Sequence, residues 1–396
     1  MYEELNDYDL TLKAYNSIKK KFNSLAVQLP KKKTFLGFDG YVDSLYSLVE
    51  SRETVTNWKK METMRFFGER VLQVAGSAAS IERVLKRKIS GGFAPNTCKA
   101  LNGIGMNVTL MAAIGYPEIQ DVFIPIIEND TIEAIPISNP GETIGLEFDD
   151  GKIMLTEFEN IFNINWELLK ERVGLDIFSD KLEIADIIGM GHWSLIPELT
   201  NIWKKMLDTI IPSINTKDML FFVDLSDIKK RSKEDILEML NTLKKIEDFM
   251  PVLLSLNDQE AIDISKALDG VDIIDPSKPE HSGYHKAGLN INKKASLSYL
   301  VIHSPYFATI TTKNHDHFWI TEGYTSKPRF TTGAGDHFHS GTVAGLSSGL
   351  SPAESILLGN ALTAIFVRTG ESPNLEDLEK FVSKYIDYIE KDNPNI

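Results

Sequence analysis

Cysteine is almost absent from this sequence, which has a single one, Cys98, among 396 residues. No intramolecular disulfide can form, so a reducing, cytoplasmic location is expected. The sequence also lacks an apolar stretch long enough to span a bilayer, and its polar N-terminus lacks the apolar core of a secretory signal. These absences predict a protein without a membrane partner.

Positive charge is scarcer than negative charge, with 42 Lys and Arg against 56 Asp and Glu and a formal net charge of -14. This balance argues against a general affinity for nucleic acid, although a local basic pocket could still bind phosphate. Apolar residues make up 42% and charged residues 25%, which is typical of a folded protein. The length suits one large α/β domain with an accessory piece, or two ordinary domains.

Short apolar runs alternate with helical patterns along most of the chain. Buried strands are predicted at 34–38, 108–115, 185–191, 219–226, 251–257 and 296–304, with helices near 94–104, 197–211, 233–247 and 258–268. Beyond Gly335 the pattern predicts helices only, at 335–349, 352–368 and 375–390. The alternation predicts a parallel sheet with helices on both faces.

Three segments depart from this alternation. Residues 1–30 read as an amphipathic helical extension, with Leu10, Leu12, Ile18, Phe22 and Leu25 as candidate apolar positions. Residues 144–158 alternate apolar and polar around Asp150-Gly151, which predicts a β-hairpin. With the extra polar stretch at 44–75, this hairpin could form a lid over the sheet, and its apolar face could pair two subunits in a homodimer.

The most informative string is TTGAGDHFHSG, at 331–341. Gly333, Ala334 and Gly335 lead into a predicted helix, where unpaired N–H groups and the helix dipole would attract an anion. A carboxylate at Asp336 would repel a bound anion. As a base, however, it could accept a hydroxyl proton while the amides stabilise a transferring phosphoryl group. The alternative is that Asp336 caps the helix.

Residues 331–338 resemble the C-terminal signature of the ribokinase-like carbohydrate kinases, the PfkB family, with Phe330 replacing the usual preceding Asp. The resemblance implies an α/β fold: a ribokinase-like three-layer α/β/α core with a mostly parallel sheet and a small β lid. The kinase domain would cover 31–396, with lid elements near 44–75 and 140–160. The resemblance also implies that the Gly333–Gly335 run forms the anion hole and that Asp336 is the catalytic base.

A second string, ISGGFAPNTCKALNGIGMNVTLMAAIG at 89–115, resembles the N-terminal signature of the same family. The resemblance implies that Gly91, Gly92 and Asn96 bind the substrate. The glycines would bring the backbone near a polyol, and the amide offers it both a donor and an acceptor. Taken alone, a Gly-Gly pair is an ordinary turn.

A third string, GFDGYVDSL at 37–45, follows the first predicted strand. Family members commonly have an Asp there that binds substrate hydroxyls, which implies Asp43 and, as a second ligand, Asp39. The alternative is that both acids are solvated loop residues.

On the nucleotide side, LSLNDQEA at 254–261 resembles the family's N-x-x-E element. The resemblance implies that Asn257 and Glu260 lie by the nucleotide, with Glu260 holding Mg²⁺ through water. An Asn with Glu three residues later is also a capping box. Thr332 and Asn360 are further nucleotide-binding candidates.

The sequence therefore predicts a Mg²⁺-dependent carbohydrate kinase that transfers the γ-phosphate of ATP to a hydroxyl of a sugar or sugar derivative. ADP as the donor is not excluded, because the spacing at 37–43 is nearest to the ADP-dependent sugar kinases. The alternatives are a nucleoside kinase of the same fold and a non-catalytic sugar-binding sensor. An intact Asp336 argues against the sensor, which needs no base.

Overall fold

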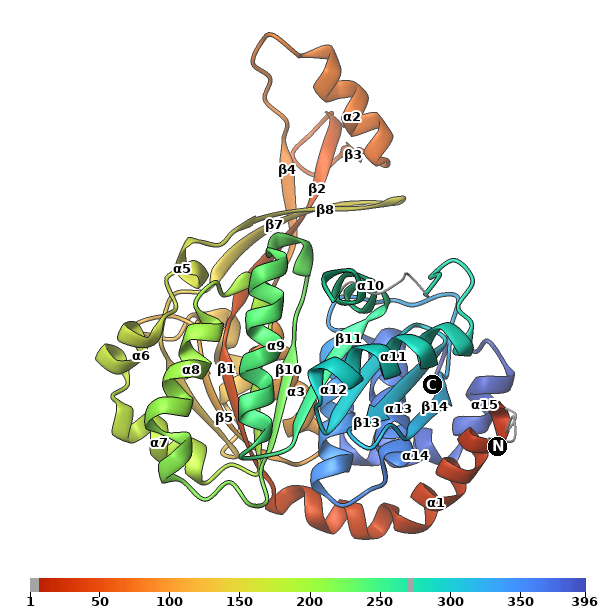
Figure 1. The fold of residues 1–396 in the computed structure, drawn as a ribbon. Coiled ribbons are helices and arrows are strands. Elements are labelled where there is room, and N and C mark those ends of the chain that lie inside the picture. The colour runs from red at the N-terminus through yellow and green to blue at the C-terminus, as the bar shows by residue number, and fades with distance from the viewer. Residues whose placement is uncertain (1–6, 269–273) are drawn as a thin grey trace.

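A nine-stranded sheet forms the centre of the molecule in the computed structural model, which describes residues 7–268 and 274–396 (Figure 1). Its strands, in spatial order, are β14 (His317–Thr321), β13 (Phe307–Thr312), β12 (Tyr299–His303), β11 (Val252–Asn257), β10 (Leu220–Asp224), β9 (Ile187–Met190), β1 (Lys33–Phe38), β5 (Asn107–Ala112) and β6 (Ile132–Pro136). Neighbours pair in parallel from β6 to β12, whereas β13 pairs antiparallel with both β12 and β14.

The six predicted strands are all present, because each is an apolar run that the sheet buries on both faces. In β11, for example, every residue from Val252 to Leu256 is buried. The sequence reading missed β6, β13 and β14, which are more polar or lie at the sheet edges.

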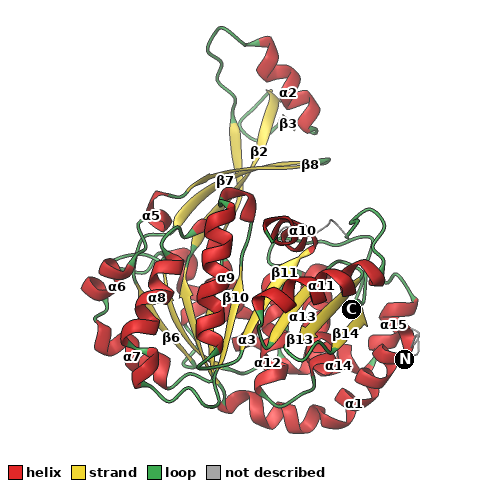
Figure 2. Cartoon of the chain, in the orientation of Figure 1, coloured by secondary structure: helices red, strands yellow, loops and turns green. Residues whose placement is uncertain are grey.

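Helices cover both faces of this sheet, which confirms the predicted three layers (Figure 2). One face carries α1 (Asp7–Gln28), α3 (Phe93–Gly103), α12 (Ala334–Ser347), α13 (Pro352–Thr369) and α14 (Leu375–Ser383). The other carries α7 (Leu175–Glu183), α8 (Leu199–Thr209), α9 (Lys233–Glu247), α10 (Asp258–Ala267) and α11 (His281–Ala295). Shorter helices are α4 (Ile124–Ile127), α5 (Glu159–Phe162), α6 (Trp166–Arg172) and α15 (Tyr385–Glu390).

The N-terminal helix α1 packs on α13 and β14. Its buried stripe is Thr11, Ala14, Ile18, Phe22 and Leu25, at the three- and four-residue spacing of one helix face. Two predicted members, at positions 10 and 12, are only half-buried because they flank this stripe. The proposed division at residue 30 stays a prediction, since this helix shares the core of the main body.

A small mixed sheet projects from the body at the carboxyl edge of the main strands (Figure 1). It contains β2 (Tyr41–Arg52), β3 (Trp58–Lys60), β4 (Arg83–Gly91), β7 (Gly141–Phe148) and β8 (Gly151–Glu157), with α2 (Met64–Gln73) at its tip. The predicted hairpin is β7 and β8, and the sheet extends beyond the predicted 44–75 because β4 pairs with β2.

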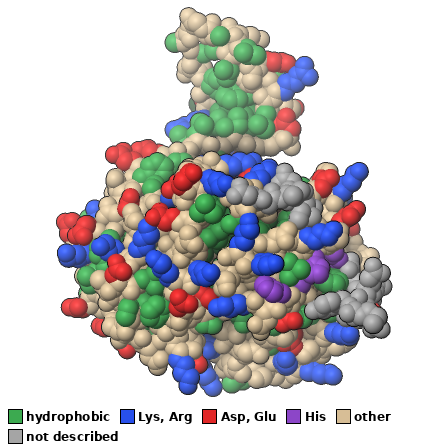
Figure 3. All heavy atoms as spheres, viewed as in Figure 1, with side chains coloured by type: hydrophobic (Ala, Val, Ile, Leu, Met, Phe, Trp, Pro, Cys, Tyr) green, Lys and Arg blue, Asp and Glu red, His purple; other side chains and the backbone are tan. Residues whose placement is uncertain are grey.

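Apolar side chains gather on this projection (Figure 3). Its exposed members are Val55, Phe66, Val71, Leu72, Leu85, Ile89, Met154 and Leu155. Its role as a lid and as a homodimer surface stays a prediction. Across the described residues, no helix combines the length and apolar character that crossing a membrane requires.

Candidate active site

Two helices, α3 and α12, begin beside each other at the carboxyl edge of the main sheet. The contact between them is polar: Asn96 Nδ2 of α3 donates to Asp336 Oδ2 of α12 at 2.9 Å. The structure therefore brings together two predicted site residues that are far apart in the sequence.

The N-terminus of α12 is open. Its N-cap, Gly333, is left-handed with φ 94° and offers no side-chain cap. Within the described part of the chain, the backbone N–H groups of Gly335 and Asp336 donate to no acceptor. Such orphan donors at the positive end of a helix dipole suit an anion. These donors lie where the anion hole is predicted, and its role stays a prediction.

Asp336 is buried, with 8% of its surface exposed. Its carboxylate does not cap α12 but turns toward Asn96, and its Oδ1 lies 3.8 Å from His339 Nε2. Burial raises the pKa of Asp336, the nearby His192 opposes the rise and Asp224 adds to it, which brings the pKa to about 7. A carboxyl group with this pKa is suited to general-base chemistry near neutral pH.

The N-terminus of α3 is closed. Its N-cap Gly92 also has a positive φ, 104°, with an extended ψ of 157°, but the first N–H groups of the helix are occupied. Phe93 N and Ala94 N donate to the two oxygens of Asp39, both at 2.9 Å. Asp39 is fully buried, and His192 Nδ1 lies 2.6 Å from its Oδ2. The role of Asp39 as a substrate ligand stays a prediction, because both oxygens already have partners.

A cleft of about 1090 Å³ lies between the small sheet and these helices. It is lined by the predicted substrate residues Asp43, Gly91 and Asn96 and by Thr332. Seven basic side chains also line it (Lys60, Lys86, Arg87, Lys88, Lys99, Lys152 and Arg329), against three acidic ones (Asp43, Glu147 and Asp149). The cleft is therefore positive in an acidic chain, as a phosphate-containing ligand requires.

Two lysines of this cleft stand close to the proposed chemistry. Lys152, on β8, donates from Nζ to Thr332 Oγ1 at 2.8 Å and so links the small sheet to the loop before α12. Burial lowers the pKa of Lys99, and the neighbouring Asp336 opposes this. Burial also raises the pKa of Asp43, which Lys152 and Lys99 offset. The sequence reading missed both lysines, although Lys99 lies three residues after Asn96 on one helix face.

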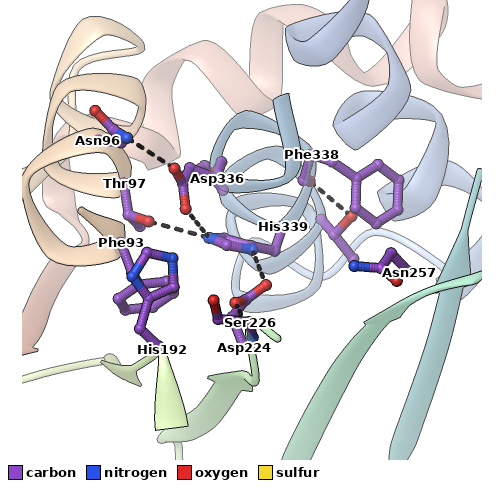
Figure 4. A network of polar contacts seen from close by, with 12 residues as sticks. Phe93, Asn96, Thr97, His192, Asp224, Ser226, Asn257, Asp336, Phe338 and His339 are labelled. Atoms are coloured by element: carbon purple, nitrogen blue, oxygen red, sulfur yellow. Dashed lines mark hydrogen bonds and ion pairs between the residues drawn. The ribbon is translucent and has the colours of Figure 1, made fainter. Parts of the chain in front are cut away.

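A polar network surrounds Asp336 (Figure 4). His339 Nε2 lies 3.0 Å from Thr97 Oγ1, and its Nδ1 lies 3.7 Å from Asp224 Oδ2 at the end of β10. Burial lowers the pKa of His339 well below its usual value, so this imidazole is neutral. His337, the other histidine beside the predicted base, instead binds Gly333 O and Ser372 Oγ, both at 2.8 Å.

The predicted nucleotide residues have structural partners. Asn257 and Glu260 form a reciprocal capping box at the start of α10, which bears out the alternative interpretation of that string. Asn360 is fully buried in α13 and donates to Ile320 O at 3.3 Å. Because α13 turns this side chain toward β14, it has no surface to offer a nucleotide in this conformation.

Comparison with known proteins gives one family. The model of the prokaryotic ketohexokinase family matches residues 10–385. A curated relative, the ketohexokinase of Haloferax volcanii, is 27% identical over 384 residues, which cover 96% of this chain and 98% of the relative.

Solved structures show the same fold at low identity. A ribokinase of Arabidopsis thaliana, complexed with ribose and ATP, matches with a TM-score of 0.61 at 12% identity, covering 89% of this chain and 98% of its own. A carbohydrate kinase of Agrobacterium tumefaciens matches with a TM-score of 0.59 at 17% identity, covering 89% and 97%. A nucleoside kinase of Methanocaldococcus jannaschii matches with 0.55 at 16%, covering 89% and 98%. The predicted ribokinase-like fold is confirmed.

Proposed function

The chain belongs to the prokaryotic ketohexokinase family, and from this we propose that it transfers the γ-phosphate of ATP to a hydroxyl of a ketohexose. It is a sugar phosphotransferase of the ribokinase family, as the sequence predicted. The family match favours this function over the nucleoside kinase and the sensor. ATP is the preferred donor in this proposal because a structural neighbour is complexed with ATP, although another is complexed with ADP.

Asp336 carries this proposal. It stands beside the open N-terminus of α12, bonded to Asn96, with a pKa of about 7. We infer that it accepts the proton of the acceptor hydroxyl as that oxygen attacks the γ-phosphorus, and the bond from this phosphorus to the bridging oxygen breaks to release ADP. The orphan N–H groups of Gly335 and Asp336 would then stabilise the charge on the transferring group. Positioning and electrostatic stabilisation are the main contributions that phosphoryl transfer needs from a protein.

The cleft provides for both substrates of this reaction. Asp43, Gly91 and Asn96 would hold the sugar hydroxyls at one end. Lys99 and Lys152 both act on Asp43, and Lys152 also contacts the loop before α12, so the charge of these lysines would offset that of the phosphates. The small sheet, through Lys152, would close over the cleft and exclude water.

Magnesium fits the carboxylates on the nucleotide side. Glu260 is 5% exposed, and burial followed by Asp224 and Asp227 raises its pKa well above the usual range, so a cation there would relieve like-charge repulsion. No group of three acidic, histidine or cysteine side chains among the described residues could hold a metal by itself. Glu260 would therefore hold the ion through water, and the bound ion would neutralise phosphate charge.

The test is an acceptor and donor panel. The purified protein is incubated with Mg²⁺, with ATP or ADP, and with D-fructose, D-glucose, D-ribose or adenosine, and acceptor-dependent nucleotide turnover is measured. We expect ATP turnover with the ketohexose above the other acceptors, and NMR of the product identifies the phosphorylated hydroxyl. Preferred turnover with adenosine, or nucleotide binding without turnover on any sugar, would contradict the proposal.

A further inference from the structure

His192 is a polar residue of the site to which neither the motifs nor the proposed mechanism gives a role. It follows β9 and the buried Gly191, and its backbone is left-handed, with φ 53° and ψ 41°. This conformation is uncommon for a residue that is not glycine, and such residues cluster at functional sites. The strand ends at the same edge of the sheet as α3 and α12 begin.

The imidazole of His192 is fixed on one side. Its Nδ1 lies 2.6 Å from Asp39 Oδ2, and Asp39 is itself held by the N–H groups of Phe93 and Ala94. The rings of Tyr41 and Phe93 flank it, with centroids at 6.3 Å and 6.2 Å. The orientation of the imidazole is therefore set by a carboxylate that cannot move without breaking the start of α3.

The same imidazole is partly open on its other side. Its side chain is 21% exposed, whereas Asp39 and His339 are wholly buried. Among the described residues, Nδ1 meets Asp39 as an ion pair without hydrogen-bond geometry, and no contact is found for Nε2, the nitrogen turned away from Asp39. Burial alone would lower the pKa of His192, but Asp39 raises it to about 10, so the ring carries a proton on each nitrogen at neutral pH.

We propose that His192 is a further acceptor-binding residue, whose Nε2–H donates a hydrogen bond to an oxygen of the bound sugar beside Asp336. Figure 4 shows His192 beside Phe93 in the group of side chains around Asp336 and Asp224. Asp39 is then a positioning residue that orients this donor. The inference rests on the proposed function, because it assumes a polyol acceptor next to the base.

A matched pair of amides tests this role. His192→Asn places an amide near Nδ1, so it keeps a donor toward Asp39 and loses the outer donor. His192→Gln places its amide near Nε2 and keeps the outer donor instead. Losing a hydrogen bond to a charged group is expected to raise KM for D-fructose by about 10- to 100-fold in His192→Asn. His192→Gln should retain part of the affinity, and KM for ATP should stay within about twofold in both.

If His192 only holds Asp39 in place and does not contact the sugar, the two variants should rank in the reverse order. In that case His192→Asn resembles the wild type, whereas His192→Gln is the weaker enzyme and loses thermal stability. That outcome would overturn the proposal, as would equal increases in the KM of ATP and of fructose. Nucleotide affinity and the unfolding midpoint of each variant show whether it is folded.

Deoxy analogues of fructose provide the second measurement, which needs only the wild type and one folded variant. The wild type should bind the analogue that lacks the contacted oxygen more weakly than fructose. His192→Asn should bind this analogue and fructose equally well. If His192→Asn does not fold, His192→Ala is used instead. If every analogue loses the same factor in both proteins, the contact does not exist. Wild-type turnover on fructose is recorded in the same series. Its absence would contradict the proposed function, whereas turnover with unaltered variants would contradict only this inference.

Discussion

Helices α3 and α12 begin in nearly the same way and lie side by side, yet only one of their N-termini is open. Each starts after a glycine with a positive φ, Gly92 or Gly333, that provides no side-chain cap. In α3, the carboxylate of Asp39, from the turn after β1, accepts the hydrogen bonds of the first turn. In α12, the nearby carboxylate is Asp336, which belongs to the helix itself and turns toward Asn96.

The difference shows what makes a helix N-terminus available to a ligand. Orphan N–H groups occur at every such terminus, so they do not define a site. At α3 the buried carboxylate of Asp39 accepts from these groups and offsets the helix dipole, which leaves no place for a second anion. On α12 they remain unpaired, and the adjacent carboxylate has a raised pKa. The terminus of α3 is therefore filled by a carboxylate of the protein, whereas the terminus of α12 is the one that we propose receives a phosphoryl group.

The largest effect is expected from Asp336→Asn, which keeps the shape of the open terminus and removes the base. Turnover should fall about 10³-fold, within the usual contribution of general-base catalysis, while nucleotide binding persists. Rapid-quench single-turnover kinetics would measure the loss. Asp377→Asn is the matched control, because Asp377 is the third residue of α14 and forms part of a capping box on the surface. A variant with at least a tenth of wild-type activity would exclude Asp336 as the base.

Asp39→Asn tests the closed terminus and should act on stability. An amide cannot accept from both N–H groups of α3 with its two terminal atoms, and the charge facing His192 is lost. Losing hydrogen bonds and a partner of a buried charge should lower the free energy of unfolding by about 2–4 kcal/mol. Urea denaturation measures this difference. Asp336→Asn should be neutral or stabilising above pH 7, because ionising that buried carboxyl is unfavourable in the folded state; the same sign for both variants would remove the contrast.

The pH dependence of turnover separates the two carboxylates further. Asp336 must be ionised to act as a base, so kcat/KM should fall about tenfold for each pH unit below a pKa near 7. Stability has the opposite dependence. Because burial raises the pKa of Asp336 above that of the unfolded chain, the free energy of unfolding should fall as pH rises from about 4 to about 7. A flat kcat/KM between pH 5 and 8 would contradict the raised pKa.

The open terminus could be predicted from the sequence, but the closed one could not. The run at 331–336 is local: small residues, a helix start and an acid occupy consecutive positions. Asp39 meets α3 only because β1 ends and α3 begins at the same edge of the sheet. Nothing in the spacing of the two segments distinguishes a helix cap from a sugar ligand, so Asp39 was predicted as a ligand.

The same distinction explains what else the sequence did and did not reveal. The central strands are continuous apolar runs and were found, whereas β4 is a largely exposed strand with no such pattern. The contact of His192 with Asp39 depends on how β9 and β1 pair, and Lys152 reaches Thr332 only through the position of the small sheet. Contacts between residues of different elements can therefore be found only from the fold, whereas residues that belong to one motif can be found from the sequence.

Alanine at the two N-cap glycines compares the termini directly. Gly92→Ala and Gly333→Ala each force a side chain onto a backbone with positive φ, which costs about 1–3 kcal/mol. An added Cβ at Gly92 would also lie 2.9 Å from Asp39 Oδ2, whereas at Gly333 its nearest neighbour is a Phe366 ring carbon at 3.2 Å. Thermal unfolding should rank Gly92→Ala as the less stable variant. If Gly333→Ala is the less stable variant, the N-terminus of α3 is not more closely packed than that of α12.

The smallest effect is expected from Lys152→Met, which removes a contact between the small sheet and the loop before α12. The lysine lies on the exposed hairpin and contacts Thr332 at 2.8 Å, so its removal should have little influence on folding. An exposed cation near a phosphate contributes about 1 kcal/mol or less, which corresponds to a rise of about three- to fivefold in KM for ATP.

Lys86→Met is the matched control, because Lys86 lines the same cleft but is paired with Glu147 at 2.6 Å. Steady-state kinetics at two salt concentrations would separate the two lysines: screening should shrink the effect of Lys152→Met toward that of Lys86→Met. Equal KM values for the two variants at low salt would show that the hairpin does not contribute to the open terminus, which would then bind phosphate through the backbone of α12 alone.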